Sequence, residues 1–328
     1  MNKILIIQTA FLGDVVLATS IIEKLVSSYP KCELHFLLRS GNQHILDLHP
    51  KLSKIWVWDK KHKYAQLFTI IRKLRNERFD LIVNLQRFAS SGLFTILSGA
   101  KETRGFKKNP FSFFFSKSVK HEISSSDHQH EINRNHKLIA DITDLNVERP
   151  KLYPSKNHFE RVKGYTLEKY ITIAPASVWY TKQWPKKKWV ELINNIDTDY
   201  RIYLIGAPGD SALCDEITAE TDKIHVTNLA GKLSPLESVA LIKGATMNFV
   251  NDSAPLHFAS AVNASVTAIF CSTVPNFGFG PLSDDATVVE VKQPLACRPC
   301  GLHGHKACPE KHFKCALDIS TDQMIQFL

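Results

Sequence analysis

The sequence predicts an α/β protein built from two Rossmann-like domains, each with a parallel sheet. Strand and helix patterns alternate along the first half, and the same alternation begins again near residue 170. A chain of 328 residues is also long for one domain and comfortable for two, because domains cluster near ~100–200 residues. The break between the halves lies in the stretch Pro150–Gly164, so we predict domains 1–158 and 159–328.

In the first half, Ile4–Ile7 is a continuous apolar run of the kind found in a strand buried on both faces. The further strands predicted are Glu33–Leu38, Ser53–Trp58 and Leu81–Leu85, and the helices are Val15–Leu25, Tyr64–Asn76 and Asn133–Leu145. The segment Lys101–Glu131 breaks the alternation because it is charged and rich in Phe and Ser. We predict an extended or mobile surface segment there, with an edge hairpin as the alternative.

In the second half the alternation opens with the strand Tyr170–Ile173 and contains no short repeat. The other predicted strands are Tyr203–Ile205, His225–Thr227, Met247–Val250 and Ser265–Phe270, and the helices are Lys188–Asn195, Ala212–Glu220, Leu236–Lys243 and Leu256–Val262.

The composition, 44% hydrophobic and 22% charged, is that of a soluble globular protein. No run approaches the ~18–20 apolar residues of a membrane span, and the N-terminal apolar stretch is short for a signal peptide, so we expect a cytoplasmic protein. The net charge of +9 favours an anionic partner, such as a phosphorylated glycolipid or an anionic membrane face; a merely lysine-decorated surface is the alternative. Nucleic-acid-binding motifs are absent, so we expect no nucleic-acid partner.

The first candidate site is Gln8–Asp14, which joins a strand to a helix at the edge where open parallel sheets bind ligands. Its single glycine, Gly13, excludes the dinucleotide fingerprint G-x-G-x-x-G and argues against a nicotinamide oxidoreductase. Asp14 is either an ordinary acid at a helix N-terminus or a general base facing an interdomain cleft. If Asp14 is a base, the substrate that gives up a proton to it is an acceptor, and we predict that Gly13 contacts it together with Arg104, which lies in the basic stretch Lys101–Lys108.

Two further loops follow strands of the second half. In Ala174–Pro185, Ser177 can hydrogen-bond a phosphate and Lys182 can supply a positive charge, although a loop lysine is often simply solvated. The loop Asn251–His257 leads into a helix N-terminus, which is a ready anion site. We predict that these loops bind a phosphorylated ligand, the donor of a transferred group, through Ser177, Lys182, Gly206, Asp252, Ser253, Ala254 and His257. For His257 the alternative is that the side chain only packs or caps the helix.

Four of the seven cysteines gather at the C-terminus, as Cys297, Cys300, Cys308 and Cys315. Their spacing is compatible with thiolate ligands of a structural zinc or iron ion. Reduced thiols, or disulfides formed only on oxidation, are the alternative. A catalytic metal is not expected, because four protein ligands leave no open coordination position.

Several of these motifs resemble those of glycosyltransferase family 9, the ADP-heptose:lipopolysaccharide heptosyltransferases. The stretch Asp252–His257 resembles the family signature D-[ST]-G-x-x-H, with Ala254 in place of the usual glycine. The other matches, in chain order across essentially the whole chain, are Gly13-Asp14 with G-D, His130–Asn135 with H-x-x-x-R-N, Pro175–Pro185 with P-G-A…K-x-W-P, and Asn228–Gly231 with N-L-A-G. The type II enzymes are the most similar.

The resemblance implies a GT-B fold, two Rossmann-like domains facing across a cleft, and an inverting transfer that needs no metal cofactor. It implies an ADP-sugar donor, a phosphorylated lipopolysaccharide core acceptor, Asp14 as the base, and Lys182 and Ser177 at the departing diphosphate. Such an enzyme would lie in the cytoplasm, peripheral to an anionic inner membrane. Another nucleotide sugar, or a non-catalytic binding protein on the same fold, is the alternative.

Overall fold

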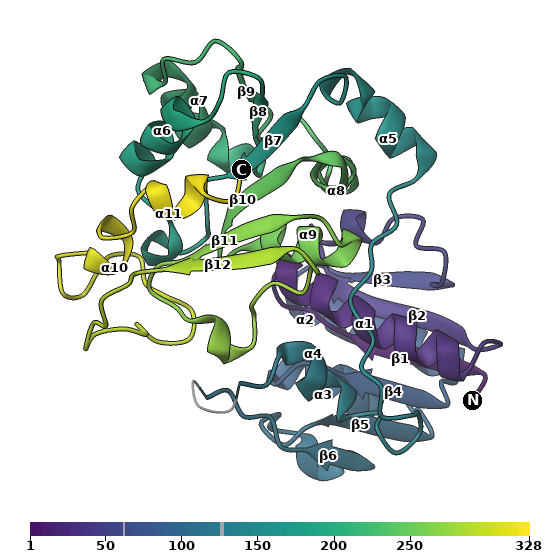
Figure 1. The fold of residues 1–328 in the computed structure, drawn as a ribbon. Coiled ribbons are helices and arrows are strands. Elements are labelled where there is room, and N and C mark those ends of the chain that lie inside the picture. The colour runs from purple at the N-terminus through teal and green to yellow at the C-terminus, as the bar shows by residue number, and fades with distance from the viewer. Residues whose placement is uncertain (62, 125–127) are drawn as a thin grey trace. The chain divides into compact units, whose positions relative to one another are not determined.

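The computed structural model describes residues 1–61, 63–124 and 128–328, and it divides into two compact units. Unit 1 consists of Met1–Ile123 with Gln129–Tyr153, and unit 2 is chiefly Pro154–Leu328. The chain passes between them at Tyr153–Pro154, inside the predicted boundary stretch and a few residues before the predicted break after residue 158. Each unit contains a six-stranded parallel sheet with helices, which confirms the predicted fold class (Figure 1).

The sheet of unit 1 has the strand order β3-β2-β1-β4-β5-β6. Its strands are β1 (Lys3–Ile7), β2 (Glu33–Arg39), β3 (Lys54–Trp58), β4 (Leu81–Asn84), β5 (Glu102–Phe106) and β6 (Lys117–Val119). Helices α2 (Lys63–Glu77) and α3 (Ala89–Leu97) share one apolar core with Leu5 and Ile7 of β1. The intervening Ile4 and Ile6 are equally buried, because α1 (Leu12–Ser28), which packs on α4 (Glu131–His136), covers the other face.

The sheet of unit 2 has the order β12-β11-β10-β7-β8-β9, which repeats the topology of unit 1. Its strands are β7 (Tyr170–Ala174), β8 (Arg201–Leu204), β9 (Val226–Asn228), β10 (Met247–Asn251), β11 (Val266–Phe270) and β12 (Ala286–Glu290). Its helices are α5 (Lys156–Val162), α6 (Lys186–Asn195), α7 (Ser211–Glu220), α8 (Pro235–Gly244), α9 (Ala254–Val262), α10 (Lys314–Leu317) and α11 (Asp322–Ile325). The short 3-10 helices of the chain are η1 (Gln43–Ile45), η2 (Ser112–Phe114), η3 (Lys163–Tyr165), η4 (Tyr180–Lys182), η5 (Pro208–Asp210) and η6 (Pro275–Phe277).

Two predictions for unit 1 are wrong. The segment Lys101–Glu131 contains β5 and β6, which pair in parallel rather than as a hairpin, although its residues 125–127 lie outside the described ranges. The helix predicted for Asn133–Leu145 ends at His136, because later carbonyls find tertiary donors: Leu138 O accepts from Arg104 and Ile142 O from Tyr29. Within the described ranges, no helix combines the length and the apolar character that crossing a bilayer requires.

Candidate functional site

Strands β7 and β10 mark the point in unit 2 where the order of the sheet reverses. They are neighbours, but the chain continues from β7 to β8 on one side and from β10 to β11 on the other. Ligands of open α/β sheets bind beyond the carboxyl ends of the strands at such a point. The predicted donor loops follow these two strands, so the fold brings Ser177, Lys182 and Asp252–His257 to the same edge of the sheet.

Asn251, the last residue of β10, ties the two loops together. Its side chain is fully buried; Nδ2 donates to Pro175 O at 2.8 Å, and Oδ1 accepts the Trp184 amide at 3.0 Å. Both ends of the loop after β7 are therefore held by one residue of the neighbouring strand. This geometry limits the positions that Lys182, which lies between those ends, can adopt.

Lys182 and Asp252 form the central ion pair of the site, with Nζ 2.6 Å from Oδ2. Their side chains are only 14% and 7% exposed. The Thr273 hydroxyl, just beyond β11, donates to the same Asp252 oxygen at 2.6 Å. A buried carboxylate needs such partners, and with them it orients the lysine ammonium group.

Helix α9 begins at Ala254, directly after this ion pair, with Ser253 as its N-cap residue. The amide groups of a first helical turn, together with the helix dipole, favour an anion. The lysine and this helix end together form a site suited to phosphate oxygens. His257 is buried one turn into α9, as expected of a histidine that packs in the protein interior.

Ser177 and Gly206 lie on the same edge of the sheet, after β7 and β8. Ser177 is partly exposed, and its carbonyl accepts Gln183 Nε2 at 2.6 Å. A Cβ atom at Gly206 would lie 2.8 Å from Asp210 Oδ2, so Asp210 leaves no room for a larger residue at this position. Asp210 in turn accepts the Ala207 amide at 2.8 Å.

The equivalent reversal in unit 1 lies between β1 and β4, and the loop Gln8–Asp14 follows β1. Buried amide side chains hold this loop: Gln8 Oε1 accepts both the Ala10 amide and Gln86 Nε2, and Asn42 Nδ2 donates to Ala10 O at 2.9 Å. Asp14, partly buried in the first turn of α1, accepts the Phe11 amide on Oδ2 at 3.2 Å. This bond is the one expected of an ordinary acid at a helix N-terminus, and the role of general base stays a prediction.

Comparison with known proteins identifies the family. The profile of glycosyltransferase family 9 (heptosyltransferase) matches residues 67–312. The chain belongs to glycosyltransferase family 9. It is similar to lipopolysaccharide heptosyltransferase 3 of Escherichia coli, with 28% identity over 80% of this chain and 82% of the relative. It is also similar to lipooligosaccharide heptosyltransferase 2 of Haemophilus influenzae, with 25% identity over 88% of each chain.

Solved structures agree on the fold of this family 9 glycosyltransferase. E. coli ADP-heptose LPS heptosyltransferase II superimposes with a TM-score of 0.81 at 20% identity, over 99% of this chain and 97% of the other. The E. coli heptosyltransferase WaaC with ADP gives a TM-score of 0.75 at 18% identity, over 99% and 98%. The two units are therefore those of the GT-B fold.

In this glycosyltransferase the Cys-rich C-terminal segment packs directly against the loop that carries Lys182. The Thr181 hydroxyl oxygen accepts the His305 amide at 2.7 Å and the Ser272 hydroxyl at 3.0 Å. The Thr181 amide donates back to His305 O at 3.1 Å. A Cβ atom at Gly304, whose φ is +74°, would lie 2.8 Å from Thr181 Oγ1 and 3.3 Å from Lys182 Cγ.

A second anchor of this segment lies between its first two cysteines. The Arg298 guanidinium group donates to Cys271 O at 2.6 Å and Thr273 O at 2.7 Å, just beyond β11, and it also pairs with Glu290. The C-terminal segment thus reaches both the lysine loop and Thr273. Sequence reasoning missed Thr181 and Thr273, because their partners are distant along the chain.

The four cysteines line one small cavity together with His312. All are free thiols; Cys297 Sγ lies 3.8 Å from His312 Nε2, and burial raises the pKa of Cys315 to about 11. Burial also raises the pKa of Cys300. In the described part of the chain, no group of three or more His, Cys, Asp or Glu residues is arranged to hold a metal ion. The structural metal therefore stays a prediction.

Arg104 does not fit the predicted role in acceptor binding. It lies in β5 with 3% of its surface exposed, and its guanidinium group binds Glu102, Asp141 and the Leu138 carbonyl. Burial and these partners give it a structural role. Arg134, in the H-x-x-x-R-N stretch, is buried in the same way and donates to Glu131 at 2.8 Å.

Proposed function

We propose that this glycosyltransferase transfers a heptose from ADP-heptose to a phosphorylated lipopolysaccharide inner-core acceptor, with inversion at the anomeric carbon. The observation that carries the proposal is the Lys182–Asp252 ion pair at the strand reversal of unit 2, beside the N-terminus of α9. Solved structures of the heptosyltransferase WaaC contain ADP or ADP-2-deoxy-2-fluoro heptose, which makes an ADP-sugar the first donor to test.

The donor diphosphate would bind to unit 2. The Lys182 ammonium group has three N–H donors, so a bond to Asp252 leaves it the capacity to bind a phosphate oxygen as well. Ser177 and the first amides of α9 would contact the remaining oxygens. Because these groups are already positioned, they stabilise the charge that develops on the departing ADP without reorganising.

The acceptor hydroxyl would lose its proton to Asp14. The hydroxyl oxygen then forms a bond to the anomeric carbon while the bond from that carbon to the diphosphate oxygen breaks, and ADP leaves with the electron pair. The Asp14 carboxylate needs no metal ion to accept the proton. The phosphorylated acceptor and the net charge of +9 both favour work at the cytoplasmic face of an anionic membrane.

Binding and transfer can be tested separately. A thermal-shift screen against ADP-, GDP-, UDP- and dTDP-sugars should show a selective stabilisation by ADP-heptose; selectivity for another nucleotide would indicate a different donor within the family. Asp14→Asn should abolish heptose transfer and leave ADP affinity unchanged. The loss of charge at the helix N-terminus should cost only about 0.5–1 kcal/mol of stability.

The matched control is Asp47→Asn, which removes an exposed acid of the same unit that pairs with His44. It should leave both transfer and ADP affinity unchanged. Full turnover in Asp14→Asn would refute the base assignment. Wild-type protein that binds ADP-heptose but transfers nothing to any lipopolysaccharide core acceptor would instead indicate a non-catalytic binding protein.

A further inference from the structure

Two neighbouring phenylalanines of unit 1 project into solvent. Phe113 is 90% exposed and Phe114 is 66% exposed, and their rings pack edge to face with centroids 5.5 Å apart. Both belong to η2, in the turn of residues 107–115 between β5 and β6, which we call the aromatic turn. Single exposed apolar side chains are ordinary, but two large adjacent rings on one projecting turn indicate a binding surface.

Hydrogen bonds of a buried side chain hold the backbone of the aromatic turn in place. Asn109 is buried; its Nδ2 donates to Gln86 O and Phe88 O, each at 3.1 Å, and its Oδ1 accepts the Phe111 amide at 3.0 Å. At the end of the turn Phe115 is buried again. The backbone that carries the exposed rings is therefore held in place before any partner binds, which lowers the entropic cost of binding.

Two glycines allow this close packing. A Cβ atom at Gly92 of α3 would lie 2.8 Å from the Phe111 ring, and one at Gly105 of β5 would lie 2.5 Å from the Phe115 ring. The turn thus rests on α3 and on β5, with Phe115 buried and Phe111 partly buried. Of its four phenylalanines, Phe113 and Phe114 are the two that are exposed to solvent.

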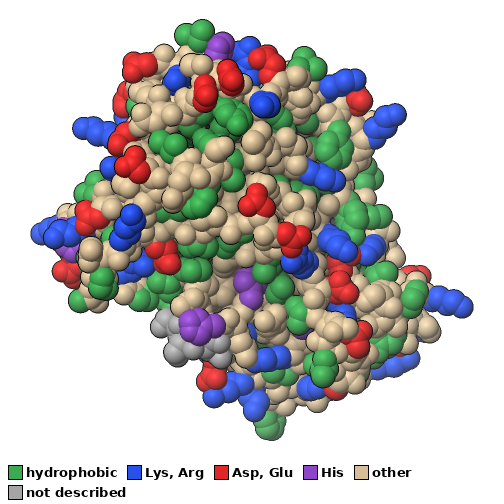
Figure 2. Space-filling model, in the orientation of Figure 1, with side chains coloured by type: hydrophobic (Ala, Val, Ile, Leu, Met, Phe, Trp, Pro, Cys, Tyr) green, Lys and Arg blue, Asp and Glu red, His purple; other side chains and the backbone are tan. Residues whose placement is uncertain are grey.

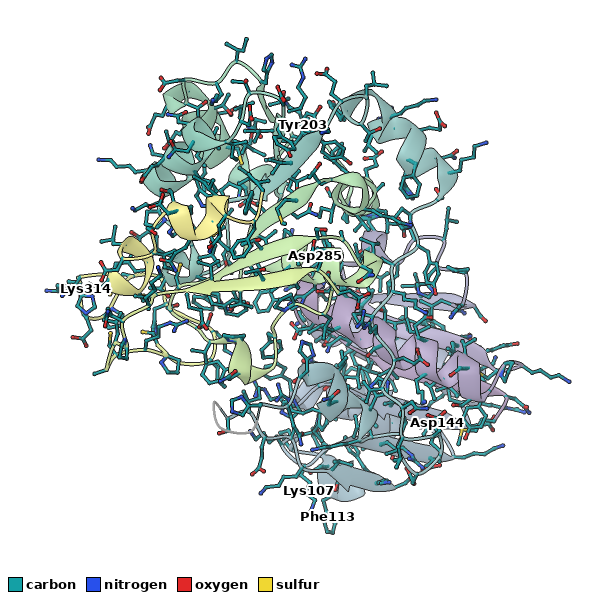
Figure 3. All side chains as sticks on the ribbon, viewed as in Figure 1. Lys107, Phe113, Asp144, Tyr203, Asp285 and Lys314 are labelled. Atoms are coloured by element: carbon teal, nitrogen blue, oxygen red, sulfur yellow. The ribbon has the colours of Figure 1, made fainter. Side chains whose placement is uncertain are left out.

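Exposed lysines lie in the same turn as the exposed rings. Lys107 and Lys108 open the aromatic turn and are both exposed. Figure 3 shows Lys107 and Phe113 pointing away from the ribbon at the same end of unit 1, and Figure 2 shows Lys and Arg side chains clustered there. Nearby acids already have close partners, Glu122 in Lys120 and Asp141 in Lys117. The turn therefore combines two exposed apolar rings with two exposed lysines.

We propose that the aromatic turn docks unit 1 on an anionic lipid bilayer, with Phe113 and Phe114 inserted at the level of the head groups. Lys107 and Lys108 then contact lipid phosphates beside the inserted rings. Transfer of phenyl rings out of water is favourable, and lysines near an anionic leaflet are attracted to it. Both contributions therefore favour binding. Charge complementarity favours a bilayer over a second copy of this basic chain, whose own turn would repel it. The proposal does not depend on the identity of the donor or on transfer.

Vesicle sedimentation without donor tests the proposal. Wild-type protein should bind phosphatidylethanolamine vesicles that contain phosphatidylglycerol, and binding should fall when phosphatidylglycerol is omitted or the salt concentration is raised. Phe113→Ser with Phe114→Ser should weaken binding by about tenfold or more. Lys107→Glu with Lys108→Glu should weaken it by a similar factor and reduce the dependence on salt.

Two controls match these changes in unit 1. Leu145→Ser removes another exposed apolar side chain, 83% exposed, and Lys31→Glu with Lys61→Glu makes the same change in net charge at other exposed lysines. Both should bind vesicles as the wild type does. As a second readout, Phe113→Trp should show a blue shift of tryptophan emission, relative to wild type, when anionic vesicles are added.

The proposal is overturned if the double serine variant binds anionic vesicles as tightly as wild type. It is also overturned if Phe113→Trp shows no blue shift, or if the serine variant loses self-association in sedimentation velocity while keeping its vesicle affinity. In that last case the turn would join two copies of the chain. ADP binding by all variants should remain at the wild-type level, which separates failure of this proposal from failure of the proposed donor site.

Discussion

Replacing Lys182 with methionine removes a charge from the centre of the proposed donor site while keeping most of the side-chain volume. In the wild type, Lys182 Nζ lies 2.6 Å from Asp252 Oδ2, and neither side chain is more than 14% exposed. The substitution has two separable effects. It leaves a buried carboxylate without its cation, and it removes the cation proposed to bind the diphosphate.

The two magnitudes follow from the burial of the pair. Breaking a buried ion pair on one side costs about 3–5 kcal/mol. Here the Thr273 hydroxyl still donates to Asp252, and the lysine is not completely buried, so we expect about 2–3 kcal/mol of stability to be lost. A charge-assisted hydrogen bond to phosphate contributes about 1.5–3 kcal/mol, so ADP affinity should fall by about 10- to 150-fold.

Urea denaturation measures the first effect, and isothermal titration with ADP measures the second. Lys182→Met combined with Asp252→Asn removes the unpaired charge, so it should recover most of the stability without recovering ADP affinity. Lys188→Met is the matched control, because its pair with Glu191 lies at the surface and should contribute at most about 1 kcal/mol. Unchanged ADP affinity in Lys182→Met would refute the phosphate role, whatever happens to stability.

Two further predictions concern the C-terminal segment. Gly304→Val should lower both stability and ADP affinity, because the valine side chain would press on Thr181 and Lys182. Gly301→Val is the control: Gly301 shares the positive φ but lacks those contacts, so this variant should lower stability alone. Titration calorimetry measures the affinity and denaturation measures the stability. If the cysteines hold a structural zinc or iron, protein purified without chelator should contain near-stoichiometric metal that Cys297→Ser with Cys300→Ser removes; metal absent from the wild type in elemental analysis would end that hypothesis.

The strands of the two sheet centres could be predicted because each is a short, continuous apolar run. Ile4–Ile7 and Tyr170–Ile173 lie within β1 and β7, and every residue of both runs is buried. The edge strands β6 and β12 and the inner strand β5 lack this signal. Lys117-Ser118-Val119 is short and only partly buried, and β5 has Glu102 and Arg104 among its five residues. Helix α3 was missed for a related reason, because its small Ser and Gly residues interrupt the apolar stripe that predicts a helix. Gly92 instead packs against the aromatic turn.

Arg104 shows where local sequence is misleading. Among the basic residues Lys101–Lys108 it has the appearance of one more surface cation, and only the structure reveals that the strand turns it inward. Its partner Asp141 lies 37 residues away, in a segment predicted as helix. The same long-range bonds that bury Arg104 also end that helix early, because the Leu138 carbonyl accepts from its guanidinium group. The early end of the helix and the burial of Arg104 therefore have one physical cause.

That the two proposed donor loops lie together could be predicted, because both follow strands of one sheet, whereas their support comes from much further along the chain. Lys182 is oriented by Asp252, Asp252 is bonded by Thr273, and the carbonyl of Thr273 is held by Arg298. Arg298 lies between Cys297 and Cys300, so any event at those thiols acts on the same series of contacts that positions the lysine. A change in the state of the cysteines, such as oxidation or metal binding, should consequently alter ADP affinity before it alters the step proposed for Asp14, which belongs to the other unit.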